Sequence, residues 1–160
     1  MRPITDACSV NGATELQIGA CAHTKLLAAW PDAQPGAKEC AGLVGSRPTA
    51  ACLLDFGYWN YVSGLIGQPM RGNWATFDLN DNDLWVHWFE KTHKVCDPSG
   101  TVSDGSFYAC ARNEAKRFLS MTDEVLDGCP ERQDPTLAVI CYWDGSFNKY
   151  VLTQLERLDG

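Results

Sequence analysis

Apolar residues recur at helical spacing near the start of the chain, and a proline ends the pattern. Four of them share one face of a helix drawn over 13–30: Leu16, Ala20, Leu27 and Trp30. Pro31 then stops the helix, because its ring cannot be placed in a continuing helical turn. The segment over 31–49 is rich in proline and glycine, which predicts a loop with room for one helical turn.

A second apolar stripe predicts a helix over 48–66. Its members fall on one side of a helix drawn over this segment: Leu54, Tyr58, Tyr61, Val62 and Leu65. A connection rich in Asn, Asp and Gly follows, and Asp81 or Asp83 is suited to cap the next helix. We expect that helix over 80–95, where aromatic residues are dense and both proline and glycine are absent.

The last third of the chain predicts one more helix and then two strands. The helix is expected over 107–126, with Gly128 and Pro130 just past its end. In the tail, β-branched and aromatic runs stand on either side of Asp144–Gly145. Because Asp-Gly between such runs favours a tight turn, the pattern predicts a β-hairpin over 135–157.

Cysteine usage indicates the compartment. The eight cysteines are spread over the whole chain, and none stand in a Cys-x-x-Cys arrangement. This usage is typical of disulfides in an oxidising compartment and gives little support to a zinc site. The N-terminus lacks the pattern of a signal peptide, and no apolar run is long enough to span a bilayer. We therefore expect a mature secreted protein without its leader and without a transmembrane segment.

Length and charge narrow the class further. A chain of 160 residues suits one core. The expected fold class is mainly α and disulfide-rich, in a single domain over 1–160 that has a helical core over 5–126 and the hairpin as an appendage. The net charge is −7 and the basic residues form no block. This distribution argues against nucleic acid as a partner, since binding to phosphates needs clustered Lys and Arg.

Two segments resemble, in order, the signature segments of the small secreted phospholipases A2 of bacteria and filamentous fungi. "TDACS" at 5–9 is similar to Thr-Asp-x-Cys, and "ACLLDFGYWNY" at 51–61 is similar to a helix of the form Cys-x-x-His-Asp-Phe-Gly-Tyr-Arg-Asn-Tyr. The residues in register are Asp55, Phe56, Gly57, Tyr58, Asn60 and Tyr61. "KVC" at 94–96 and "CARNEAKRFL" at 110–119 resemble later helices of the family.

The resemblance implies a chemistry and a scaffold. In the family, a His activates water as general base, and calcium holds the oxyanion that develops as a phospholipid ester is cleaved. The resemblance assigns Asp6, the Ala7 carbonyl and Asp55 to calcium, which prefers oxygen ligands. It also implies an antiparallel pair of helices over about 48–66 and 80–95.

The resemblance implies two disulfides as well, Cys8–Cys52 and Cys96–Cys110. Cys21–Cys40 and Cys129–Cys141 then follow as local remainders, although eight cysteines allow on the order of a hundred pairings.

Three positions depart from the family pattern. Leu54 stands where the family has its catalytic His, and an isobutyl group cannot accept a proton. Trp59 replaces an Arg, and Cys52 stands three residues before Asp55 instead of four, a shift of about 100° around a helix. A core leucine also fits position 54. The candidates to line a ligand groove are Leu54, Tyr58, Trp59 and Tyr61.

A relocated base is an alternative. His87 stands four residues after Asp83, which is the best candidate for the Asp that orients the family's His from the facing helix. If His87 reached toward Asp55, the protein would be an active calcium-dependent phospholipase A2. His23 and His93 are most simply explained as surface or hydrogen-bonded side chains.

A second family provides another alternative. "LWVHWFEKTHKVC" at 84–96 is similar to the second active-site segment of T2-type secreted ribonucleases, and "AAWPDA" at 28–33 is similar to part of their first. The catalytic His of that first segment would fall at Ala28. This family needs a central sheet, whereas the middle of the chain has a helical pattern.

Three functions remain on these grounds. The first is a catalytically inactive phospholipase A2-like secreted protein that binds a phospholipid, a membrane surface or a host protein, as a microbial effector would. The second is a hydrolase that uses His87 or another base. The third is a partner-binding module in which the aromatic residues form an exposed patch.

Overall fold

A computed structural model describes residues 1–66, 90, 92–119, 122–129 and 135–159 of the chain. These residues form two compact units. Unit 1 comprises Met1–Val62 and Tyr150–Gly160, and unit 2 comprises Ser63–Lys149. Two long helices, α3 (Ser46–Ile66) and α7 (Pro135–Asp159), contribute residues to both units. The expectation of a single domain over 1–160 stays a prediction.

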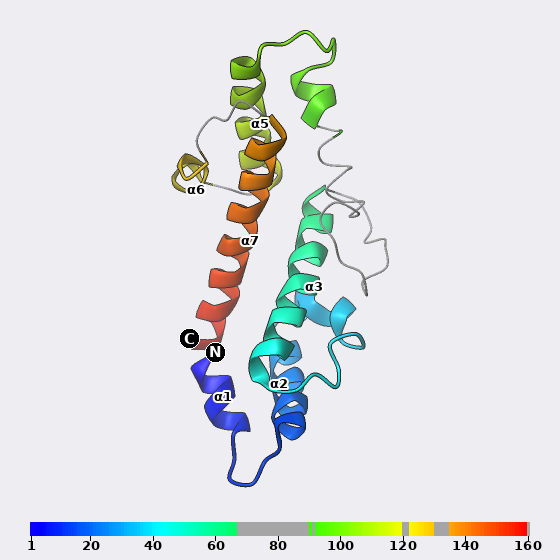
Figure 1. Cartoon of the computed structure of the whole chain (residues 1–160), viewed down its shortest axis with the longest axis vertical. Helices are drawn as coiled ribbons and strands as arrows, with labels where there is room; N and C mark the ends of the chain where they lie inside the picture. Colours follow the sequence, from blue (N-terminus) through cyan, green and yellow to red (C-terminus); the bar gives the residue numbers. More distant parts are fainter. Residues whose placement is uncertain (67–89, 91, 120–121, 130–134, 160) are drawn as a thin grey trace. The chain divides into compact units, whose positions relative to one another are not determined.

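Unit 1 begins with a short helix and a longer one that a turn connects (Figure 1). These are α1 (Arg2–Cys8) and α2 (Glu15–Ala29). Thr14 caps α2 and forms a capping box with Gln17, in which each side chain accepts a hydrogen bond from the other residue's backbone N–H. The helix predicted over 13–30 is therefore confirmed, and it ends at Ala29, where Trp30 is the cap residue before Pro31.

The segment between α2 and α3 contains the expected helical turn. It is η1 (Pro31–Gly36), a stretch of 3-10 helix. A hydrogen bond ties the end of α2 to α7. The Trp30 indole N–H donates it to the Gln154 carbonyl at 3.1 Å. The core of unit 1 includes the fully buried side chains of Leu26, Trp30, Leu53, Trp59 and Val62.

Unit 2 contains α5 (Asp104–Phe118) and α6 (Asp123–Asp127) together with the first part of α7. One helix was expected over 107–126, so the structure corrects that prediction. The helix begins earlier, where the Ser103 side chain accepts a hydrogen bond from the Ser106 N–H, and it ends at Phe118. A new helix starts after Thr122, which is a residue type that favours helix starts.

The β-hairpin expected over 135–157 is wrong, because α7 runs through the whole segment. The buried side chains of Tyr142, Ser146, Tyr150 and Gln154 lie at intervals of four residues, and positions 144, 148 and 152 between them are exposed. All seven would share one face of a strand, so the pattern is helical. Asp144–Gly145 therefore lies inside a helix. A glycine there costs about 1 kcal/mol relative to alanine, and the burial of two tyrosines offsets that cost.

The helix expected over 48–66 is confirmed as α3. Most of its expected partner over 80–95 lies outside the described residues, although residues 92–96 are helical. The antiparallel arrangement of the pair therefore stays a prediction. Among the described residues, no helix is long and apolar enough to cross a membrane.

Four disulfides join segments that are neighbours in the chain: Cys8–Cys21, Cys40–Cys52, Cys96–Cys110 and Cys129–Cys141. The last two are the pairs that were expected. Cys8–Cys52 and Cys21–Cys40 are wrong, because α1 leads directly into α2 and brings Cys8 beside Cys21. Each observed bridge closes a separation of 12 to 14 residues, and short loops of this kind cost little entropy to close.

Candidate functional site

The candidate site is the signature segment of α3, residues 51–61, with the parts of unit 1 that surround it. α3 is buried around most of its circumference here. The exposed positions form a narrow stripe that includes Arg47, Ala51 and Asp55. Leu54 lies off this stripe, and its relative exposure is 8%. The position where the resemblance places a catalytic base is therefore part of the core.

Phe56 and Gly57 of the signature are explained by close packing. The ring of Phe56 lies against Gly36 of η1, where a Cβ on Gly36 would be 2.6 Å from the nearest ring atom. A Cβ on Gly57 would be 2.5 Å from the Tyr150 hydroxyl oxygen and 3.6 Å from the Ala33 Cα. The two glycines thus allow η1, α3 and α7 to approach one another.

The aromatic residues of the signature form a cluster with α7. Tyr58 contacts the edge of Trp59 at a centroid distance of 5.2 Å, and Tyr150 lies 5.7 Å from Tyr58 and stacks on Tyr61 at 5.4 Å. Tyr58 and Trp59 are buried, whereas Tyr61 is partly exposed. Of the four groove candidates, Leu54, Tyr58 and Trp59 therefore belong to the core, and only Tyr61 offers accessible surface.

Tyr150 is a member of this cluster that the sequence analysis missed. Burial of its hydroxyl, with a smaller effect from the nearby carboxylate of Asp32, raises the pKa of Tyr150 well above its usual range. The phenol consequently stays protonated at any physiological pH. The residue was placed in a predicted strand, and only the helical spacing of Tyr142, Ser146 and Tyr150 could have located it.

Asn60 also has a structural role. Its side-chain amide donates a hydrogen bond to the backbone carbonyl of Asp32 at 3.0 Å, which ties α3 to the start of η1. A disulfide also joins Cys52 of α3 to Cys40, which lies in the segment between η1 and α3. The signature residues other than Asp55 thus have packing or hydrogen-bonding roles within unit 1.

Asp55 is the exception. It lies on the exposed stripe of α3, yet the surrounding protein removes enough water to raise the pKa of its carboxyl above the ordinary value. A bound cation would act in the opposite direction, because it favours the ionised carboxylate.

The other expected calcium ligands lie on α1. Asp6 and Ala7 are exposed residues of this helix, whose Thr5 hydroxyl is 3.3 Å from the Ser46 hydroxyl at the start of α3. In the described part of the chain, no group of three or more His, Cys, Asp or Glu side chains could hold a metal ion. Calcium binding by Asp6, the Ala7 carbonyl and Asp55 stays a prediction.

The histidines divide between described and undescribed segments. The candidates His87 and Asp83 lie outside the described residues, so the relocated base stays a prediction. The Nε2 atom of His23 lies 2.6 Å from the Ala37 carbonyl oxygen, as expected for a hydrogen-bonded side chain. The ring of His93 packs on Phe107 at 4.8 Å in unit 2.

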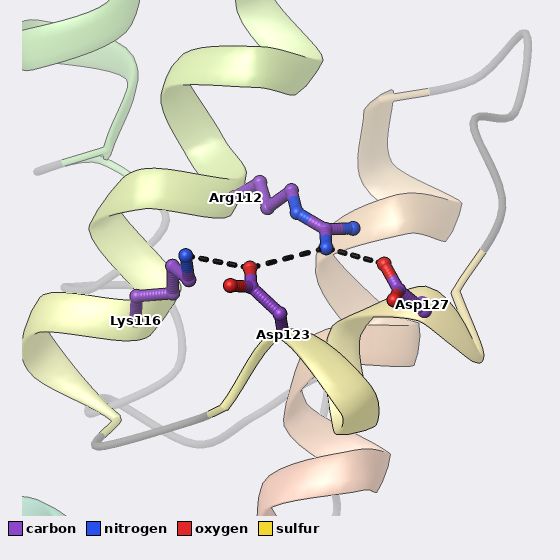
Figure 2. A network of polar contacts seen from close by, with 4 residues as sticks. All are labelled: Arg112, Lys116, Asp123 and Asp127. Atoms are coloured by element: carbon purple, nitrogen blue, oxygen red, sulfur yellow. Dashed lines mark hydrogen bonds and ion pairs between the residues drawn. The ribbon is translucent and has the colours of Figure 1, made fainter.

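Unit 2 carries a separate charged cluster that joins α5 to α6 (Figure 2). Arg112 pairs with Asp123 at 3.3 Å and also with Asp127, and Lys116 pairs with Asp123. The hydrogen bond from Lys116, followed by that from Arg112, lowers the pKa of Asp123 below its usual range. Because each cation faces a carboxylate and both carboxylates are largely exposed, we assign the cluster to holding α6 in place.

Comparison of the chain with protein families, with characterised proteins and with solved structures finds no match. The interpretation of the signature segments therefore rests on the residues themselves. The T2-type ribonuclease alternative gains no support from the described ranges, which contain no strand of the central sheet that such a family needs.

Proposed function

We propose that the protein is a secreted, catalytically inactive phospholipase A2-like protein that acts by binding, and that a phospholipid surface is its ligand. One observation supports the loss of catalysis above all others. The side chain at the position of the family's general base is a leucine, which has no proton acceptor and is only 8% exposed.

Packing around Leu54 also argues against a lipid-ester site at this place. The adjacent aromatic side chains of Tyr58 and Trp59 are buried in the core of unit 1. A substrate chain would have to displace them, and removing an aromatic side chain from a core costs several kcal/mol. Binding is therefore better sought on the surface than in the signature helix.

Exposed aliphatic side chains support the choice of a lipid surface. Among the described residues of unit 1, Val10, Leu16 and Val44 are 66%, 56% and 58% exposed. The loop that contains Val44 is tied to the start of α2 by a hydrogen bond of 2.9 Å from the Gly45 N–H to the Glu15 carbonyl. Leu16 and Val44 therefore stand on adjoining segments. Aliphatic side chains carry no polar group that would lose its hydrogen bonds to water in a bilayer, so burying them there is favourable.

Sedimentation with phospholipid vesicles tests this proposal. We expect the protein to bind neutral phosphatidylcholine vesicles, because the net charge of −7 gives no attraction to anionic ones. Leu16→Glu should reduce the affinity by about 10- to 150-fold, since burying one leucine is worth roughly 1.5–3 kcal/mol.

Val95→Glu is the matched control. Val95 is 49% exposed and belongs to unit 2, whereas Val10, Leu16 and Val44 belong to unit 1. It should leave the affinity unchanged. If the unchanged protein does not sediment with vesicles of either charge, the lipid part of the proposal is wrong. A protein partner would then be the ligand to seek.

A further inference from the structure

The turn between α1 and α2 places an asparagine and a glycine at its exposed tip. The Ala13 N–H donates a hydrogen bond of 3.0 Å to the Val10 carbonyl, so Asn11 and Gly12 are the two central residues of a β-turn. Both are exposed, and Gly12 has a φ of +83°, in the region that favours glycine.

We propose that Asn11 is a site of spontaneous deamidation, which converts it into aspartate and isoaspartate. The Gly12 backbone nitrogen bonds to Cγ of Asn11, the Cγ–Nδ2 bond breaks, and ammonia leaves with the proton from the Gly12 N–H. Water then opens the resulting succinimide ring. Attack at Cγ gives aspartate, and attack at the backbone carbonyl gives isoaspartate, in which the main chain passes through the former side chain.

The surroundings of Gly12 leave this reaction unhindered. A Cβ on Gly12 would meet nothing within 4 Å, so no neighbouring group obstructs the ring as it closes. The hydrogen bond of the turn uses the Ala13 N–H, and in the described part of the chain no acceptor engages the Gly12 N–H. The attacking nitrogen is therefore available.

The other described asparagines provide the contrast. Asn60, Asn113 and Asn148 lie inside α3, α5 and α7, and a residue with a bulky side chain follows each of them. Within a helix, the N–H of that following residue is held by a carbonyl four residues back. These three positions should resist the reaction that Asn11 undergoes.

The modification would change the charge of the loop while the fold is kept. It adds one negative charge to a chain whose net charge is −7, next to the exposed side chain of Val10. The Cys8–Cys21 disulfide holds both ends of the turn. The new carboxylate also precedes the N-terminus of α2, where the helix dipole favours negative charge.

Peptide mapping by mass spectrometry tests the proposal. The folded, disulfide-intact protein is incubated in mildly alkaline buffer, and samples are digested over time. We expect the peptide with Asn11 to gain the mass of an amide-to-acid change and to split into aspartate and isoaspartate forms. Peptides with Asn60, Asn113 and Asn148 should stay unchanged, and Asn11→Gln should abolish the change at this position.

A parallel incubation of reduced, denatured protein tests the role of the folded loop. Conversion of Asn11 in the denatured chain but not in the folded protein would overturn the proposal, because it would mean that the native turn protects the site. Equal conversion of Asn11 and the helical asparagines in the folded protein would overturn it as well.

Discussion

Gly57 shows at the scale of one residue why the signature of α3 is compatible with a structural role. The hydroxyl oxygen of Tyr150 occupies the space where any larger residue would place its Cβ, at 2.5 Å. Gly57 and Tyr150 both belong to unit 1, so this close approach fixes α7 against α3 within that unit. Packing alone therefore explains why position 57 is a glycine, and no role in catalysis is needed.

Substituting this glycine tests the packing directly. We expect Gly57→Ala to destabilise the protein by about 1–3 kcal/mol, because the added methyl overfills a packed contact. Gly64→Ala is the matched control in the same helix, where a Cβ meets nothing within 4 Å, and it should stabilise the protein by roughly 0.5–1 kcal/mol. Urea unfolding gives both values, and equal effects of the two substitutions would contradict the packing account.

Tyr150 makes a second prediction at this scale, on alkaline stability. Its pKa in the folded protein is raised above the ordinary value near 10, so the folded state holds the phenolic proton more tightly than the unfolded state. The stability from this group is complete below about pH 10 and is lost as the pH rises further. Tyr150→Phe should make the alkaline decline of the unfolding free energy shallower, and an unchanged slope would contradict the assignment.

At the scale of elements, α6 is a short helix that depends on its neighbour. Its five residues, Asp123–Asp127, are too few to form a stable helix alone. Leu126 is fully buried, and ion pairs from Arg112 and Lys116 hold the two aspartates at the ends of the helix. The apolar contact and the ion pairs together keep α6 on α5.

Salt should weaken this attachment, because exposed ion pairs are screened by ions. We expect faster hydrogen exchange at the α6 amides in high salt than in low salt, and Asp123→Asn should remove most of that dependence. Asp144→Asn, an exposed aspartate of α7, is the control that should keep it. Acid should also weaken the attachment of α6. Because the pKa of Asp123 is lowered, its ion pairs stabilise the folded protein until the pH falls below the usual range of a carboxyl.

α7 shows what local sequence signals leave undetermined. Val139, Ile140 and Val151 favour strands, and Asp144–Gly145 favours a turn, so local signals indicated a hairpin. Burial of a side chain at every fourth position overrode them. In contrast, the extent of α2 was predictable, because helical spacing, the Thr14 cap and Pro31 after its end agree with one another. The face that the structure buries carries Gly19, Ala22 and Leu26, whereas Leu16 and Ala20 of the predicted face are exposed.

At the scale of the whole molecule, the sequence was sufficient to predict the fold class but not to predict which cysteines pair. Helical periodicity and an even set of cysteines predict a helical protein with disulfides, and both features are present. Of the two pairings that the resemblance implied, Cys96–Cys110 is present and Cys8–Cys52 is wrong, and the remainder Cys21–Cys40 is wrong with it. Here Cys8 ends a helix that turns back at once, so Cys21 is the sulfur within reach.

The candidate site was predictable in its residues and not in their surroundings. From the sequence, Leu54 is both a departure from the family pattern and a residue that suits a core. That η1 and α7 would close around the signature could not be seen, because Ala33, Gly36 and Tyr150 lie far from it in the sequence. The surroundings turn a segment that resembles a catalytic helix into the packed centre of unit 1.

The central claim is that this signature no longer supports hydrolysis, and one assay tests it most directly. Release of fatty acid from mixed phospholipid vesicles is measured with calcium and with chelator for the unchanged protein and for Leu54→His. We predict no release from either, since a His at position 54 would take the place of a core side chain that is only 8% exposed. Calcium-dependent release by the unchanged protein would contradict the claim, and His87 would then be the first residue to substitute.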